Sequence, residues 1–191
     1  AGLGGGSADV AALLRCLRRL YAAGMPDEAL RAIGLTVGSD VPFCVSGGTS
    51  LAEGRGERLT DLPPLPVCQI VLCKPDFGIS TPELFVLADG AVLSKRPDIA
   101  GLTAALQGGE LTGVTDRLCN VFEEFLPERY REVFRIKEIL LAHGALNAAM
   151  SGSGPTVYGI FESAAEAQRA AEVLKKSYQQ TYVAKPVKKL V

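Results

Sequence analysis

The sequence has few of the residues that commonly report on metal or redox chemistry. It contains no tryptophan and one histidine, His143, and none of its five cysteines forms a C-x-x-C pair. Closely spaced cysteine and histidine clusters are typical of zinc sites, and an even set of cysteines is typical of a disulfide framework. Neither is indicated here. We therefore expect reduced thiols and a cytoplasmic location.

Long apolar runs and an excess of charge of one sign are also missing. No apolar run approaches 18 residues, and 20 basic residues nearly balance 21 acidic ones. A membrane helix needs about 20 apolar residues, and nucleic-acid binding usually needs a basic surface. We expect neither a membrane nor a nucleic acid as partner. With 191 residues, 48% of them hydrophobic, the chain suits one large or two small globular domains.

Hydrophobic periodicity predicts the elements of the first third of the chain. Ser7 is placed as the N-cap of a helix whose apolar face runs from Val10 to Tyr21. Val41 precedes Pro42, so we expect it to be extended. The remaining predictions are a short helix from Pro26 to about Gly34, a turn-rich stretch over 38–48 and a hairpin over 49–62.

After a Pro-rich linker candidate at 62–66, the pattern alternates between strands and helices. We expect strands at 67–75, 156–161 and 180–191, and helices at 81–87, 99–106, 120–142 and 164–178, the third interrupted at Pro127. Residues 145–155, ALNAAMSGSGP, are small and Gly-rich, and no strand or helix is predicted there. This order is typical of an α+β or split βαβ sandwich.

The opening stretch AGLGGGSA (residues 1–8) has the composition of a phosphate-binding loop. Glycines let successive backbone N–H groups converge on an anion, and a following helix adds its dipole. The stretch lacks the Gly-Lys-Ser/Thr of a Walker A loop and does not complete G-x-G-x-x-G. By itself it fits a flexible Gly-rich segment equally well.

Two further stretches allow both a chemical and a structural interpretation. In GSDVPF (38–43), Asp40 could accept a proton from a hydroxyl nucleophile, or it could serve only its own turn. In MSGSGP (150–155), alternating serines and glycines make a donor-rich loop. That loop could face a phosphate or could simply connect a helical region to a strand.

Taken together, these stretches resemble the GHMP kinase superfamily, named for galacto-, homoserine, mevalonate and phosphomevalonate kinases. GLGGGSAD (2–9) resembles its second motif and MSGSGP its third. Within the superfamily, GSDVPF, GGTSLAEGRGE (47–57) and KPDFGISTPELF (74–85) are most like the branch of 4-diphosphocytidyl-2-C-methyl-D-erythritol kinases. The five matching stretches occur in family order over residues 1 to about 161.

The resemblance implies a reaction and a set of site residues. ATP would phosphorylate the 2-hydroxyl of a CDP-linked methylerythritol in non-mevalonate isoprenoid precursor synthesis. Asp40 would be the catalytic acid/base and Mg²⁺ would accompany ATP, with Ser7 as one candidate metal ligand. The ATP phosphates would be bound by Ala1, Gly2, Leu3, Gly4, Gly5, Gly6, Ser7 and Ala8. The substrate side would include Thr81, Phe85, Ser151, Gly152, Ser153 and Gly154.

The resemblance also implies a fold and a division of the chain. Residues 1–66 would be a remnant of a ribosomal-protein-S5-domain-2-like ATP-binding domain, and residues 67–191 a ferredoxin-like α/β sandwich. The family's first motif, which carries a lysine that partners the aspartate, has no match. We therefore expect the C-terminal two-thirds of a kinase, inactive by itself.

Asn120 departs from the family's pattern because Val121 follows it where Asp is common, which puts a site role for Asn120 in doubt. The open alternatives to this kinase are another GHMP kinase, of homoserine or mevalonate type, and a non-catalytic nucleotide-binding module.

Overall fold

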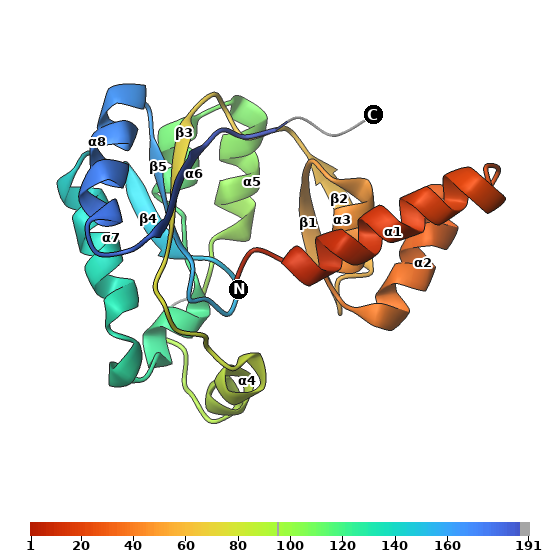
Figure 1. Cartoon of the computed structure of the whole chain (residues 1–191), viewed down its shortest axis with the longest axis horizontal. Helices are drawn as coiled ribbons and strands as arrows, with labels where there is room; N and C mark the ends of the chain where they lie inside the picture. The colour runs from red at the N-terminus through yellow and green to blue at the C-terminus, as the bar shows by residue number, and fades with distance from the viewer. Residues whose placement is uncertain (95, 188–191) are drawn as a thin grey trace. The chain divides into compact units, whose positions relative to one another are not determined.

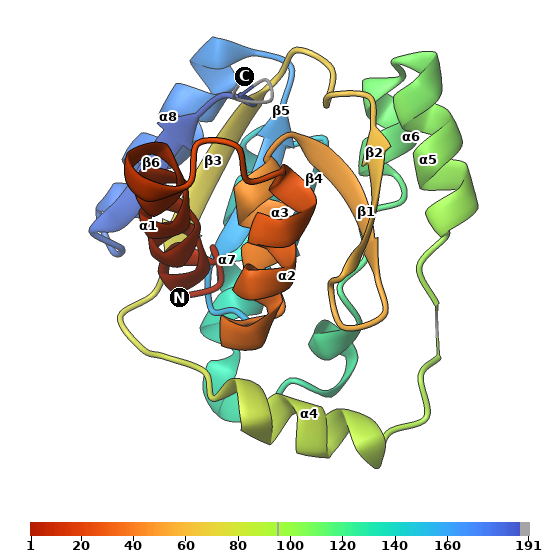
Figure 2. The ribbon, with the colours of Figure 1, turned by 90° about the vertical axis from the view of Figure 1, so that its right-hand side faces the viewer.

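A computed structural model of the chain describes residues 1–94 and 96–187. The chain divides into two compact units, and each is described by itself. The first unit contains Ala1–Leu3 and Leu65–Pro186, and the second contains Gly4–Pro64 together with Val187. Figure 1 colours both along the chain, and Figure 2 shows a second view of the same ribbon.

The first unit is built on one four-stranded antiparallel sheet. Its strands stand in the order β4-β5-β3-β6, so the central pair joins β3 to β5. The bounds are β3 Gln69–Lys74, β4 Asn147–Met150, β5 Val157–Phe161 and β6 Gln180–Ala184. Val71 and Cys73 on β3 are fully buried, as the apolar run VCQIVLC predicts for a central strand.

Two helices cover one face of this sheet, α7 (Glu132–Ala142) and α8 (Ala164–Lys175) (Figure 1). Leu140 of α7 and Leu174 of α8 pack with Phe161 in a single apolar cluster. Counting only sheet strands and these two helices, the chain runs β-α-β-β-α-β, the ferredoxin-like arrangement. The expected α/β sandwich is therefore confirmed.

Shorter elements lie between β3 and α7. They are α4 (Thr81–Asp89), α5 (Ile99–Gly108), α6 (Leu111–Thr115) and the 3₁₀ turns η1 (Val121–Phe125) and η2 (Glu128–Tyr130). The long helical region expected over 120–142 is thus broken, with Pro127 between the two 3₁₀ turns. Proline lacks the N–H that an unbroken helix would use. A second apolar cluster joins Leu111 of α6 to Ile160 of β5.

Strand β4 was not expected, because its sequence NAAM has no β-branched or large aromatic residue. Pairing with β5 creates it: Ala148 lies opposite Gly159 and Met150 opposite Val157. Its small side chains are almost completely buried. Long-range pairing therefore outweighs the weak local preference of this stretch.

The second unit combines three helices with a β-hairpin. The bounds are α1 Gly5–Tyr21, α2 Asp27–Val37, α3 Val41–Ser46, β1 Thr49–Glu53 and β2 Arg58–Leu62. The two strands pair antiparallel around the turn Gly54–Gly56, from Thr49 opposite Leu62 to Glu53 opposite Arg58, which confirms the expected hairpin. Its small core contains Ala11, Leu30, Val41 and Val45.

Several local predictions for this unit were wrong. Gly4, at φ 61°, and not Ser7, is the N-cap of α1. Helix α2 continues past Gly34 to Val37. Glycine at this position lets α3 pack closely against α2, because a Cβ there would lie only 2.6 Å from the Val41 side chain. Val41 is the first residue of α3 and is not extended. On the expected apolar face of α1, Leu20 and Tyr21 are 70% and 81% exposed.

Candidate functional site

The predicted phosphate loop is divided between the two units. In the second unit, α1 begins at Gly5 without any side-chain cap. A Cβ added at Gly4, Gly5 or Gly6 would meet no atom within 4 Å, so open space surrounds the first turn. The first N–H groups of a helix have no partner within the helix. The start of this 17-residue helix therefore combines exposed donors with the positive end of a helix dipole.

The first two residues contact the β4–β5 loop of the first unit. Thr156 Oγ1 donates to the Ala1 carbonyl at 2.6 Å, and Ser151 Oγ donates to the Gly2 carbonyl at 2.5 Å. Gly2 adopts φ +80°, and a Cβ there would lie 2.9 Å from the Ser151 carbonyl oxygen. Only glycine combines this conformation with this approach. Two of the predicted stretches, 1–8 and 150–155, are thereby brought together.

Thr81 and the loop Ser151–Gly154 also meet. Thr81 Oγ1 and Ser153 Oγ are 2.6 Å apart, so one hydroxyl donates to the other. Thr81 begins α4, whose N-cap is Ser80. One turn further along α4, Phe85 is 55% exposed, which is unusual for a ring of this size. All the predicted substrate-side residues therefore lie in the first unit.

Asp40 lies in the second unit, at the N-cap position of α3. It is exposed, and α3 receives no hydrogen bond from a side-chain cap. The structural interpretation, in which Asp40 serves its own turn, is therefore not supported. At the other end of α3, Arg15 Nη1 of α1 donates to the Cys44 carbonyl at 2.7 Å. This contact satisfies a terminal carbonyl of α3 and fixes the helix that carries Asp40.

Other groups surround Asp40 within the second unit. A Cβ built on Gly38 would lie 3.9 Å from Ser7 Oγ, so Ser7 of α1 is close to the turn before Asp40. The hairpin turn also approaches closely, since a Cβ on Gly56 would lie 2.2 Å from the Ser39 carbonyl oxygen. Burial and the negative charge of Asp40 raise the pKa of the Cys44 thiol, which keeps it protonated.

Two further side chains, Asn120 and Glu123, contact the end of β4. The sequence analysis put a site role for Asn120 in doubt and did not single out Glu123. Asn120 Nδ2 donates to the carbonyls of Met150 and Gly152 at 2.7 and 2.8 Å. Glu123 Oε1 accepts from Met150 N at 2.6 Å, and its carboxylate pairs with Lys137. A cavity of about 350 Å³ lies beside them, lined by Cys119, Asn120, Phe122, Ser151, Gly152 and Tyr158 among others. Burial, with a smaller effect of the Glu123 charge, raises the pKa of Tyr158.

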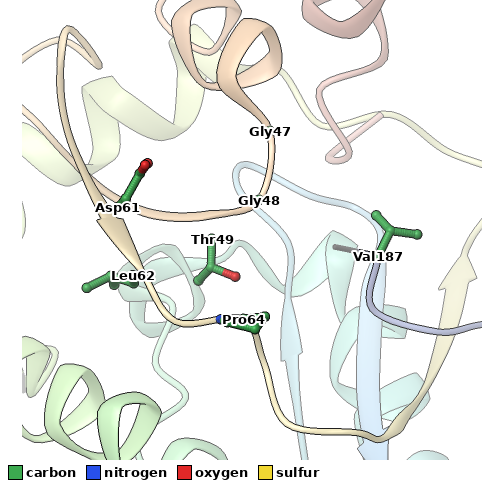
Figure 3. A pocket seen from close by; sticks show the side chains of 7 residues that line it. All are labelled: Gly47, Gly48, Thr49, Asp61, Leu62, Pro64 and Val187. Carbon is green, nitrogen blue, oxygen red and sulfur yellow. The ribbon is translucent and has the colours of Figure 1, made fainter. Parts of the chain in front are cut away.

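Other candidate features contribute little. Across residues 1–94 and 96–187 no group of three or more His, Cys, Asp or Glu side chains could hold a metal ion. In the same part of the chain, no helix is both long and apolar enough to cross a membrane. Figure 3 shows a pocket of about 340 Å³ in the second unit, lined by Gly47, Thr49, Asp61 and neighbours. None of the predicted site residues lines it.

Comparison with known families matches both units. The GHMP kinases N terminal domain matches residues 1–48, and the GHMP kinases C terminal domain matches residues 102–180. A crystal structure of a 4-(cytidine 5'-diphospho)-2C-methyl-D-erythritol kinase superposes with a TM-score of 0.79 and is 31% identical in sequence, covering 97% of this chain and 66% of that chain. Homoserine kinase from Cytophaga hutchinsonii superposes at 0.73 with 20% identity, over 99% of this chain and 66% of that one, which shows the fold alone.

Curated relatives are similar over almost the whole chain. The 4-diphosphocytidyl-2-C-methyl-D-erythritol kinase of Clostridium acetobutylicum is 39% identical over 98% of this chain and 67% of its own length. That of Enterococcus faecalis is 43% identical over 98% of this chain and 66% of its own length. The chain spans about two thirds of the length of these relatives. It belongs to the GHMP kinases, in the 4-diphosphocytidyl-2-C-methyl-D-erythritol kinase family.

Proposed function

We propose that the gene product containing this chain transfers the γ-phosphoryl group of ATP to the 2-hydroxyl of 4-diphosphocytidyl-2-C-methyl-D-erythritol. The observation that carries the proposal is about 40% identity to relatives of that name over 98% of the chain. The homoserine kinase of Cytophaga hutchinsonii and the mevalonate kinase of L. major share the fold at only 20% and 19% identity. The proposal places the enzyme in the cytoplasm, in isoprenoid precursor synthesis.

The ATP phosphates are assigned to Ala1–Ala8. The uncapped start of α1 supports this assignment, because its first turn is open and carries unpartnered donors. A helix N-terminus attracts anions through both its N–H groups and its dipole. The hydrogen bonds from Ser151 to the Gly2 carbonyl and from Thr156 to the Ala1 carbonyl support a common role for the two stretches.

Asp40 is assigned as the catalytic base. Its carboxylate is exposed and is not used to cap α3, so it is available to a substrate hydroxyl. In the proposed step the hydroxyl proton moves to Asp40 while the hydroxyl oxygen bonds to the γ-phosphorus. The bond from that phosphorus to the bridging oxygen breaks and ADP leaves. A positioned base typically contributes about 10²–10⁴-fold to such a rate.

The substrate side is assigned to Thr81, Phe85 and Ser151–Gly154. The exposed ring of Phe85 offers a surface on which a cytosine can stack, and the serine-rich loop offers donors to a diphosphate. Mg²⁺ would be bound mainly by the ATP phosphates, whose charge it neutralises during transfer. No protein ligand set is assigned to it, since the described residues form no acidic or histidine cluster.

Two domains of the family are proposed, with residues 1–66 as the end of the ATP-binding domain and residues 67–191 as the ferredoxin-like domain. The two compact units follow this division except at Ala1–Leu3, at residues 65–66 and at Val187.

A substrate panel tests the proposal. The complete gene product should phosphorylate the CDP-linked alcohol with ATP and Mg²⁺, and should leave homoserine and mevalonate unchanged. Residues 1–191 alone should show little or no turnover. Phosphorylation of homoserine or mevalonate instead would overturn the substrate assignment, and robust turnover by residues 1–191 would overturn the assignment of this chain as an incomplete kinase. Binding of ATP without any phosphoryl transfer by the complete product would favour a nucleotide-binding module.

A further inference from the structure

The segment Asn120–Phe125, which we call the brace, contacts two groups of residues that the proposed function places on the substrate side. One is the loop Ser151–Gly154 and the other is Phe85 on α4. These groups are far apart in sequence. Residues that connect them are candidates for setting their mutual geometry.

The Asn120 side chain forms hydrogen bonds through both its nitrogen and its oxygen. Its amide nitrogen donates to the Met150 and Gly152 carbonyls, while its Oδ1 accepts from Phe122 N at 3.0 Å and caps η1. A single side-chain amide therefore links the end of β4 and the loop to the first turn of the brace. Because a primary amide offers two donor hydrogens and an acceptor oxygen, no other side chain of this size can make all three bonds.

Glu123 makes a second link to the same strand end. Its carboxylate accepts from Met150 N and pairs with Lys137 of α7. The Glu123 and Lys137 side chains are 15% and 21% exposed, so solvent screens this pair less than an ion pair at the surface. Both backbone polar groups of Met150 are therefore bonded to side chains of the brace, the N–H to Glu123 and the carbonyl to Asn120.

Phe122 extends the brace to α4. Its ring meets Phe85 edge to face, with centroids 5.2 Å apart and an interplanar angle of 81°. It also contacts Phe125 at 5.9 Å in a similar edge arrangement. Edge-to-face pairs have a preferred geometry, so Phe122 restricts where the exposed ring of Phe85 can lie.

We propose that Asn120 and Glu123 are positioning residues for the Ser151–Gly154 loop. Phe122, which also belongs to the brace, positions the ring of Phe85 on α4. The effect of these residues on catalysis rests on the proposed function. Their effect on the order of the Ser151–Gly154 loop does not depend on that function. Asn120 acts through the Met150 and Gly152 carbonyls and is not itself assigned a contact with the substrate.

Hydrogen exchange of the 191-residue chain tests the structural part. The loop contains two hydrogen-bonded amides, Ser151 N to the Thr156 carbonyl and Gly154 N to the Ser151 carbonyl. Asn120→Ala removes three hydrogen bonds and should accelerate exchange of these two amides about 5- to 100-fold. Glu123→Ala should do the same, and Glu123→Gln, which keeps an acceptor for Met150 N, should restore much of the protection.

Asn147→Ala is the matched control. Asn147 is also half-buried and donates to a backbone carbonyl, that of Thr115 at 2.7 Å, but it lies at the other end of β4. The Asn147→Ala variant should leave the exchange rates of the Ser151 and Gly154 amides within about twofold of those in the unsubstituted chain. Equal acceleration by Asn147→Ala, or no acceleration by Asn120→Ala and Glu123→Ala, would overturn the assignment.

Kinetics of the complete gene product separate this inference from the proposed function. Asn120→Ala should lower kcat/KM for the CDP-linked alcohol about tenfold or more, while Asn147→Ala stays within about twofold. If the unsubstituted product has no kinase activity, the proposed function fails, and the exchange experiment still decides whether Asn120 orders the loop. If that product is active and Asn120→Ala changes neither exchange nor kcat/KM, the positioning role is wrong and the proposed function stands.

Discussion

Alkaline pH should destabilise the first unit through two buried groups in its core, Cys73 and Tyr178. Cys73 is fully buried, and burial raises the pKa of its thiol from 9.0 to about 11, against a smaller opposite effect of the Thr181 hydroxyl. Burial, followed by the hydrogen bond to Glu132, raises the pKa of Tyr178 from 10.0 to about 12. Tyr178 is 7% exposed.

Both groups hold their protons more tightly in the folded chain than in the unfolded one. Their contribution to stability is therefore complete below about pH 8 and is lost as pH rises, from 9 to 11 for Cys73 and from 10 to 12 for Tyr178. At pH 10 the loss is about 1.4 kcal/mol for Cys73 and about 0.4 kcal/mol for Tyr178. The free energy of unfolding should thus fall by about 2 kcal/mol between pH 7 and pH 10 because of this pair.

Urea unfolding at pH 7, 8, 9 and 10, followed by far-ultraviolet circular dichroism, measures this loss. The double variant Cys73→Ala/Tyr178→Phe should be less stable at pH 7 but should lose about 2 kcal/mol less on going to pH 10. Cys119→Ala/Tyr182→Phe is the matched control, because both of its side chains are exposed. An identical pH dependence for the core double variant and the unsubstituted chain would refute the reasoning.

Three further predictions concern the site and the core. Asp40→Asn in the complete gene product should lower kcat by about 10²–10⁴-fold while ATP still binds, and a loss below about threefold would remove Asp40 from catalysis. Gly2→Ala forces a Cβ into the left-handed region and toward the Ser151 carbonyl, so the affinity for ATP should fall about 5- to 30-fold in a titration; unchanged affinity would separate Gly2 from the nucleotide. Leu140→Ala should lower the free energy of unfolding, measured with urea, by about 2–5 kcal/mol. Leu141→Ala should lower it by less than about 1 kcal/mol, because Leu141 is 44% exposed. Similar losses for the two variants would contradict the packing of α7.

Asp40 and Glu123 are carboxylates with different proposed roles, and each lies in a different environment within its own unit. Asp40 is exposed at a helix start, whereas Glu123 is largely buried with a lysine partner. An exposed carboxylate can meet a substrate, and a paired, buried one can hold a backbone amide in place. This difference is why the structure supports a catalytic assignment for one and a positioning assignment for the other.

The sequence alone determined the features that depend on local chemistry. Periodicity predicted α8 and the strand β3, because each has an unambiguous apolar pattern. The Gly-rich opening and the loop at 150–155 were identifiable because glycine and serine have special backbone and donor properties. Together with the resemblance in motif order, these features indicated the family.

Tertiary structure decided the features that depend on contacts between distant residues. Strand β4 exists because it pairs with β5, although NAAM by itself has little strand preference. Gly34 stays within α2 because Val41 packs against it, whereas locally glycine is a stop signal. The two carbonyls that Asn120 contacts lie 30 and 32 residues further along the chain, so its contacts could not be predicted locally. A local sequence pattern carries no information about such partners, since the fold alone brings them within hydrogen-bonding distance.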